Sequence, residues 1–141
     1  MKSKNKDTVL VIGASRLGAS IASYCSKSGI YSIIVDKDKE SFKKLDPSFS
    51  GFFIEGNAES LTVLQKAHVG EAKEVDVVTG DDDTNVLLAC LVARFFDVAY
   101  INVRLSDQTK EKLLPRERVS VISPSSLAYD LYQNLRNREE R

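Results

Sequence analysis

The stretch VLVIGASRLG at residues 9–18 decides the fold of this chain of 141 residues. Its four apolar residues predict a buried strand, and the glycines at positions 13 and 18 predict a tight turn that leads into a helix. The N–H groups that begin such a helix can hold a phosphate. The phosphate-binding pattern G-x-G-x-x-G has a glycine where this chain has Ser15. We expect Ser15 to narrow the site without abolishing it, because its side chain is small and its hydroxyl can donate to a phosphate oxygen.

Short strand-like runs alternate with helical segments along the rest of the chain. The predicted strands are residues 9–12, 31–35, 51–54, 75–79, 99–103 and 119–122. The predicted helices are residues 17–28, 39–45, 61–67, 84–96, 108–113 and 126–137. This alternation predicts an α/β fold with a doubly wound, mostly parallel, Rossmann-like sheet of six strands in the order 3-2-1-4-5-6.

Composition argues against several classes of function. Twenty basic residues balance twenty acidic ones, so bulk charge does not indicate a nucleic-acid partner. No apolar run approaches the ~18 residues that cross a bilayer, so direct membrane insertion is not expected. Cys25 and Cys90 lie far apart and His68 is the single histidine of the sequence. A zinc motif is therefore absent from the sequence, and we expect no metal site.

The length fits one principal domain. We divide the chain into a polar tail at residues 1–7, a nucleotide-binding domain at residues 8–124 and a C-terminal amphipathic helix at residues 125–141. The leucines of this helix recur every four residues, at Leu127, Leu131 and Leu135. Such a stripe packs on its own domain or on a partner subunit. Because the sixth strand has already ended the sheet, we keep dimerisation through this helix as one of the two expectations.

Asp36 ends the second predicted strand, 23 residues after Gly13. An acidic residue at this position accepts hydrogen bonds from ribose hydroxyls and repels a 2′-phosphate, so an NADP-type ligand is disfavoured. The alternative is that Asp36 only caps the helix that follows. The strand, turn, helix and acid in register favour nucleotide binding.

Two further charged features admit more than one interpretation. The guanidinium of Arg16 either folds over the phosphates or lies in solvent in the first helical turn. The run TGDDDTN at residues 79–85 follows the fourth strand, and Asp82 or Asp83 can cap the next helix. The three consecutive carboxylates suit a ribose, a metal ion or no ligand at all.

Taken together, these pieces resemble the regulator-of-potassium-conductance (RCK) family, also called the KTN or TrkA N-terminal domain family. The resemblance runs from residue 9 to residue 124 and rests on a combination of short motifs. These are GASRLG at 13–18, VDKDKE at 35–40, GNAE at 56–59, EVDVVTGDDDTN at 74–85, ARF at 93–95, NVR at 102–104 and SP at 123–124. Ser15 and Asn57 depart from the glycine and aspartate that are usual in the family.

The resemblance implies a set of site residues. The phosphates would lie in the turn formed by Gly13, Ala14, Ser15, Arg16, Leu17 and Gly18, and the ribose at Asp36. Residues near the adenine would be Lys37, Asn57 and Ala58, with Thr79 and Gly80 flanking the ligand. Asp82 and Asn85 match the acidic motif after strand four, and Arg104 matches the strand-five arginine. The ligand would be ATP, ADP, AMP or NAD(H).

The family resemblance also implies the function. We expect a non-enzymatic, cytoplasmic regulatory subunit or domain at the inner face of the membrane. Its homodimer or larger ring would gate a potassium transporter or channel according to nucleotide occupancy. The alternative is a small NAD-dependent oxidoreductase, which needs an acid or base beside the nicotinamide. The sequence has no Tyr-x-x-x-Lys pair, and His68 falls in a loop away from the expected nicotinamide position.

Overall fold

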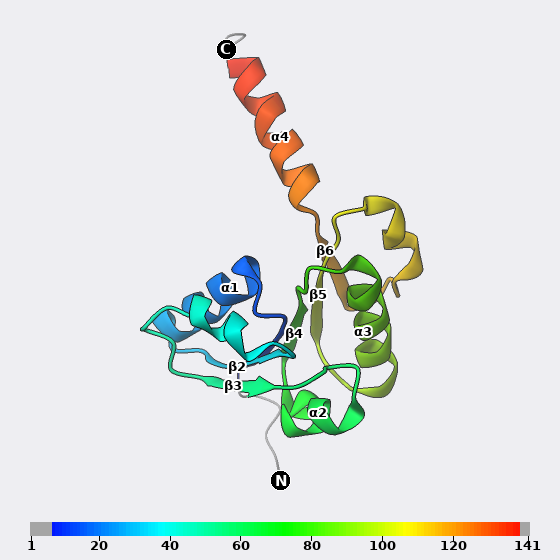
Figure 1. Ribbon diagram of the computed structural model, residues 1–141. Helices are drawn as coiled ribbons and strands as arrows, with labels where there is room; N and C mark the ends of the chain where they lie inside the picture. The colour runs from blue at the N-terminus through cyan, green and yellow to red at the C-terminus, as the bar shows by residue number, and fades with distance from the viewer. Residues whose placement is uncertain (1–6, 139–141) are drawn as a thin grey trace.

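The computed structural model describes residues 7–138 and shows a sheet with helices on both faces (Figure 1). Its strands are β1 (Thr8–Ile12), β2 (Tyr31–Asp36), β3 (Phe52–Glu55), β4 (Glu74–Val77), β5 (Tyr100–Arg104) and β6 (Val119–Ile122). The α-helices are α1 (Arg16–Lys27), α2 (Leu61–Lys66), α3 (Asp82–Phe95) and α4 (Pro124–Asn137). Three 3-10 helices, η1 (Lys39–Lys44), η2 (Val69–Glu71) and η3 (Gln108–Leu113), complete the fold. Apart from Asp7, the predicted polar tail lies outside the described residues, as do the last three residues of the predicted C-terminal helix.

The six strands form one sheet in the order β3-β2-β1-β4-β5-β6, which confirms the predicted order. All five neighbouring pairs are parallel, so the sheet is wholly rather than mostly parallel. The chain moves outward from β1 in one direction and then crosses to β4 to continue in the other. The carboxyl ends of β1 and β4 therefore border the crevice in which folds of this type bind ligands.

Side chains that point alternately to the two faces of the sheet build two apolar layers. Val9 and Val11 of β1 pack with α1 and η1, and Leu10 and Ile12 pack on the opposite face with α2 and α3. Successive side chains of a strand point to opposite faces, so a strand buried on both sides reads as an unbroken apolar run. This arrangement explains why the opening stretch of the sequence contains no polar residue before its first glycine.

Two predicted helices, 39–45 and 108–113, are 3-10 helices instead. Each begins after an aspartate, Asp38 or Asp107, whose side chain accepts a hydrogen bond from the N–H two residues later. The first buries only Phe42 and the second buries none of its residues. With so little apolar surface to align along one face, these short segments adopt the tighter 3-10 form.

Asp76 is a carboxylic acid in the centre of the sheet, with only 1% of its surface exposed. It lies between Val11 and Asn102 on the neighbouring strands, and its Oδ1 accepts a hydrogen bond of 2.8 Å from the Asn102 amide. Its Oδ2 has no hydrogen-bond partner within the described chain. Burial raises the pKa of Asp76 to about 8, and the nearby Glu74 raises it further, against a lowering effect of Asn102. Asp76 is therefore largely protonated at neutral pH.

Helix α4 leaves the end of β6 and projects away from the rest of the domain (Figure 1). Ser123 caps its first turn, and Pro124 occupies the first helical position, which needs no N–H donor. None of its residues is buried, and its large apolar side chains are between 49% and 61% exposed, namely Leu127, Tyr129, Leu131, Tyr132 and Leu135. The predicted leucine stripe thus does not pack on its own domain. None of the helices within residues 7–138 is long and apolar enough to span a bilayer.

Candidate functional site

A cavity of about 390 Å³ opens at the carboxyl ends of β1, β2 and β4. Its walls come from the turn after β1, the end of β2, the turn after β3 and the turn after β4, which are distant in sequence. This is the crevice where the two halves of a doubly wound sheet diverge. Its volume is in the range of small-molecule and cofactor sites.

The two glycines of the first turn are required by its geometry. Gly13 has a φ of +107°, and a Cβ there would lie 2.8 Å from the backbone nitrogen of Thr79. A Cβ on Gly18 would lie 1.9 Å from the carbonyl oxygen of Gly13. The tight turn predicted from the two glycines is confirmed, and Gly18 is needed in addition for the close approach of the helix to the carbonyl of Gly13.

Ser15 has a different role from the one expected. It is the N-cap of α1, and its Oγ accepts a hydrogen bond of 3.1 Å from the N–H of Gly18. The same hydroxyl donates to the carbonyl of Val78 at 2.7 Å, so its proton points at the protein and not at a phosphate. Ser15 therefore fastens the start of α1 to the end of β4 while still lining the cavity.

Three backbone N–H groups at the start of α1 remain available to a ligand. The N–H groups of Gly13, Ala14, Gly18 and Ala19 are each bonded within the protein. Those of Ser15, Arg16 and Leu17 have no hydrogen-bond partner within residues 7–138. Together with the positive end of the helix dipole, they provide the donors that an anion at this turn needs.

Asp36 links the second strand to the phosphate-type turn. Its Oδ2 accepts a hydrogen bond of 2.8 Å from the N–H of Ala14, and its Oδ1 accepts one of 2.8 Å from the N–H of Asp38. The cap of the next helix is Asp38, so the helix-cap interpretation of Asp36 is wrong. Each carboxylate oxygen can accept a second bond, which leaves acceptors for the hydroxyls of a sugar.

The turn after β3 supplies the wall opposite the first turn. Asn57 and Ala58 line the cavity there, as does Lys37 from the end of β2. The Oδ1 of Asn57 accepts a hydrogen bond of 2.9 Å from the N–H of Glu59, while no partner within residues 7–138 takes its amide protons. Asn57 can thus donate to a ligand, but its oxygen is already engaged by the turn.

Thr79 and Gly80 form the wall after β4, and Asn85 fixes their position. Asn85 is fully buried, and its Oδ1 accepts hydrogen bonds from the N–H and the hydroxyl of Thr79 at 3.1 and 2.5 Å. Its Nδ2 donates to the carbonyls of Thr79 at 3.1 Å and Arg104 at 2.9 Å. Asn85 does not line the cavity. Its bonds hold the cavity wall at Thr79 in position.

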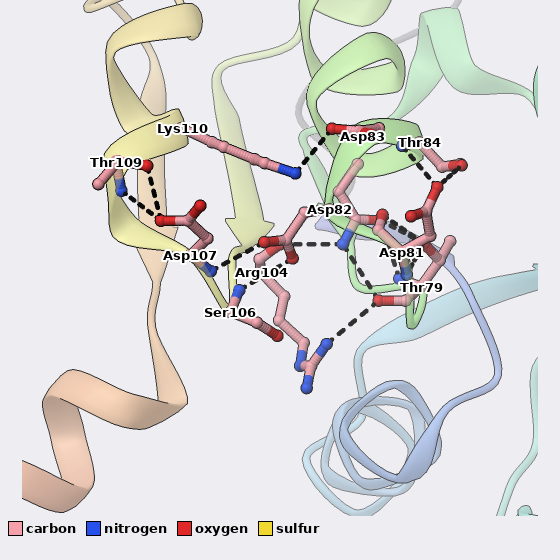
Figure 2. A network of polar contacts seen from close by, with 11 residues as sticks. Thr79, Asp81, Asp82, Asp83, Thr84, Arg104, Ser106, Asp107, Thr109 and Lys110 are labelled. Atoms are coloured by element: carbon pink, nitrogen blue, oxygen red, sulfur yellow. Dashed lines mark hydrogen bonds and ion pairs between the residues drawn. The ribbon is translucent and has the colours of Figure 1, made fainter.

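The three aspartates after β4 have separate tasks, which Figure 2 shows. Asp81, not Asp82 or Asp83, is the N-cap of α3, and its side chain accepts from the N–H of Thr84 at 3.1 Å. The two oxygens of Asp82 accept from the N–H groups of residues 106 and 107 at 2.9 and 2.8 Å. Asp83 forms an ion pair with Lys110 at 2.8 Å. The cluster thus joins α3 to the segment after β5, and only Asp81 lines the cavity.

Arg16, expected near the phosphates, and Arg104, expected at the site as the strand-five arginine, lie outside the cavity lining. Arg16 is exposed at the first position of α1. Arg104 is half-buried at the end of β5, with its guanidinium 3.5 Å from the carbonyl of Thr79 and extended away from Asp82 (Figure 2).

The cavity brings together nine of the fifteen residues expected at the site. They are Gly13, Ala14, Ser15, Asp36, Lys37, Asn57, Ala58, Thr79 and Gly80. The six that do not line it are Arg16, Leu17, Gly18, Asp82, Asn85 and Arg104. Polar lining residues that the sequence analysis did not include are Ser41, Lys44, Glu59, Asp81 and Thr84. Ser41 and Lys44 lie on η1, Glu59 lies in the turn after β3, and Asp81 and Thr84 lie at the start of α3.

The sequence matches the model of the TrkA-N domain family over residues 9–124, most of the chain. The chain belongs to the TrkA-N domain family. The family assignment made from the short motifs is thereby confirmed. Within residues 7–138, no three His, Cys, Asp or Glu side chains come together as they would around a metal ion.

A curated relative in the same family is the Trk system potassium uptake protein TrkA homolog of Pyrococcus abyssi. It is 29% identical over 127 residues, which are 85% of this chain and 56% of the relative. The chain thus spans about half the length of this relative. The relatives are named for potassium uptake by the Trk system, in agreement with the predicted link of this TrkA-N domain to potassium transport.

Two solved proteins share the fold at low sequence identity. The RCK domain of GsuK has a TM-score of 0.79 and 21% identity, and the match covers 96% of this chain and 29% of that one. Other structures of GsuK with this fold are bound to ADP and to NAD. The TrkA-N domain of the inner membrane protein YbaL from Escherichia coli has a TM-score of 0.80 and 15% identity, covering 92% of this chain and 96% of that one.

Proposed function

We propose that this chain is a nucleotide-sensing regulatory domain of a potassium uptake transporter or channel. The observation that carries the proposal is the turn after β1, where N–H groups at the start of α1 without a partner within residues 7–138 follow Ala14, whose own N–H is bound by the Asp36 carboxylate of the cavity lining. The N–H groups suit a phosphate and the carboxylate suits a ribose, the two groups that a nucleotide combines. Membership of the TrkA-N family supports the link to potassium transport.

The proposed ligand is an adenine nucleotide, ATP, ADP or AMP, or NAD(H). The ADP and NAD complexes of GsuK support this class of ligand. A carboxylate at position 36 repels a 2′-phosphate, which disfavours NADP. Because a ligand shifts a conformational equilibrium only through different affinities for two arrangements, regulation requires that the cavity differ between the two states of the assembly.

The structure offers less support to the alternative, an NAD-dependent oxidoreductase. His68 does not line the cavity. Hydrogen bonds from Thr84 lower the pKa of Asp81, so this cavity carboxyl stays ionised and is a poor proton donor. Asp76, the acid whose pKa is raised, lies inside the sheet and also outside the cavity lining.

The proposed assembly is a homodimer or a larger ring formed through α4, placed in the cytoplasm at the inner face of the membrane beside a potassium transporter or channel subunit. The exposed apolar residues of α4 support a contact with a second copy, since a helix with this pattern is stabilised by covering its apolar face. We propose neither nucleic-acid binding nor membrane insertion.

Calorimetric titration with ATP, ADP, AMP, NADH and NADPH tests ligand binding. We expect Asp36→Asn to weaken binding by about 10- to 100-fold, because a hydrogen bond to a charged group contributes roughly 1.5–3 kcal/mol. Glu40→Gln removes a carboxylate from the same segment without touching the cavity lining and should leave affinity unchanged. Equal affinity of the Asp36 variant and the wild type would reject the ribose contact. Steady NADH consumption with a small carbonyl compound would favour the enzyme.

Sedimentation velocity tests the role of α4 in assembly. Leu131→Asp places a charge in the leucine stripe and should convert a dimer into a monomer. Gln133→Asp adds the same charge about 200° around the helix, where we expect no effect on assembly. A protein that is monomeric without substitution, or a Leu131 variant that remains dimeric, would contradict the proposed interface.

A further inference from the structure

The cavity contains a cation, Lys44, that lies beside the phosphate-type turn. The Nζ of Lys44 donates to the carbonyl oxygen of Ala14 at 3.3 Å, although the two residues are 30 positions apart in sequence. Ala14 is the second residue of the turn, and its N–H is held by Asp36. Lys44 lines the cavity, whereas Arg16, the basic residue within the turn, does not.

The position of Lys44 follows from the 3-10 form of η1. With three residues per turn, Ser41 and Lys44 lie above one another on the same face, and both line the cavity. Phe42 anchors the segment from another face, buried and with its ring centroid 4.8 Å from that of Phe53. In Figure 1 the cyan segment of η1 lies beside α1 on one side of the sheet. Lys44 is therefore carried by a packed element and not by a loop.

The neighbouring lysine, Lys43, has a different environment. Its side chain is 78% exposed, forms an ion pair with Glu40 and does not line the cavity. The two lysines have the same charge and adjacent positions, but only one faces the site. Lys43 is thus a matched control for Lys44.

The charges of the cavity show why a cation at this point matters. Three carboxylates line it, those of Asp36, Glu59 and Asp81, against the two ammonium groups of Lys37 and Lys44. The carboxylates would therefore repel a phosphate at the turn unless a cation lay close to it. The ammonium of Lys44 has three donors, of which one is directed at Ala14, so two remain for an anion.

We propose that Lys44 is the phosphate-binding cation of this cavity and that it makes the cavity select phosphorylated nucleotides over nucleosides. The proposal rests on the nucleotide-binding function given above. A lysine binds a phosphate as a point charge, and charge-assisted bonds of this kind are about twice as strong as neutral ones. Lys44 thereby adds the charge that the N–H groups of the turn lack.

Calorimetric titration of the full chain with ADP and with adenosine, in low salt, tests the proposal. We expect Lys44→Gln to lower the affinity for ADP by about tenfold or more and to leave the affinity for adenosine unchanged. Lys43→Gln should bind both compounds as the wild type does. Raising the KCl concentration should weaken ADP binding more in the wild type than in the Lys44 variant.

The possible outcomes distinguish a failure of the role of Lys44 from a failure of the nucleotide-binding function. A wild type that binds ADP together with a Lys44 variant that binds it equally well overturns the role of Lys44 and leaves nucleotide binding intact. An equal loss of ADP and adenosine affinity in the variant also overturns it, because the effect would then come from the packing of η1. A wild type that binds neither compound overturns the nucleotide-binding function and the role of Lys44 together.

Discussion

The buried carboxyl of Asp76 makes the stability of this domain depend on pH in a defined direction. Its pKa is raised from 3.8 to about 8 in the folded state. The folded chain therefore keeps a proton that the unfolded chain loses above pH 4. This contribution to the free energy of unfolding is fully present below pH 4 and is lost as the pH rises towards 8. Between pH 5.5 and pH 7.5 the loss amounts to ~3 kcal/mol, at 1.36 kcal/mol per pH unit.

Asp76→Asn removes this dependence, because an amide of the same shape carries no titrating proton. Its oxygen can still accept the bond from Asn102. We expect the variant to be more stable than the wild type at pH 7.5 by on the order of 3 kcal/mol, after allowance for one buried N–H donor without a partner. The advantage should shrink as the pH falls towards 4, because the unfolded wild-type chain then begins to bind the proton that the folded chain already holds.

Urea unfolding followed by far-ultraviolet circular dichroism at pH 5.5 and 7.5 measures the effect, with the slope of the transition checked for constancy. Asp130→Asn, which removes an exposed acid from α4, is the control and should follow the wild type at both pH values. The reasoning fails if the wild type is equally stable at the two pH values. It also fails if the Asp76 variant keeps the same pH dependence.

Four further substitutions, one of them a control, test the geometry around the cavity. Gly18→Ala puts a Cβ 1.9 Å from the carbonyl of Gly13 and should prevent folding to a soluble domain. Gly80→Ala is the control and should melt like the wild type, because no atom lies within 4 Å of the new Cβ. Asn85→Ala leaves buried backbone groups without partners and should reduce stability by roughly 3 kcal/mol in urea unfolding. Ser15→Ala removes the N-cap of α1 and should reduce stability by ~1 kcal/mol, and an unchanged urea midpoint would contradict its capping role.

The strand order could be predicted from the sequence because it depends on local signals. Each strand is a short run that is apolar or alternates apolar and polar residues, and right-handed crossovers leave few ways to connect six such runs. The two glycines of the first turn could be predicted for the same reason. The local requirements are the φ of +107° at Gly13 and the contact of Gly18 with the carbonyl of Gly13, five residues away, although Gly13 also lies too close to Thr79 for a side chain.

The features that were not predicted depend on contacts between distant residues. In the run of three aspartates, each side chain could cap a helix, and the choice of Asp81 follows from the engagement of Asp82 by residues 106 and 107. Lys44 reaches the first turn across 30 positions through the packing of η1. Ser15 binds Val78, 63 positions away. Hydrophobic periodicity and turn chemistry identify neither the partner of Lys44 nor the partner of Ser15.

The bonds of Asn85 have a mechanical consequence for α4. They join the cavity wall at Thr79 to the end of β5 at Arg104, which pairs with Ile122 of β6, the residue before the cap of α4. The connection is short, and in a densely packed interior it is stiff. A helix of 14 residues is ~21 Å long, so a tilt of about 5° at its base moves its far end by ~2 Å. Only β5 lies between the cavity wall and the strand that carries α4, so a small rotation at the base of α4 becomes a larger displacement at its far end.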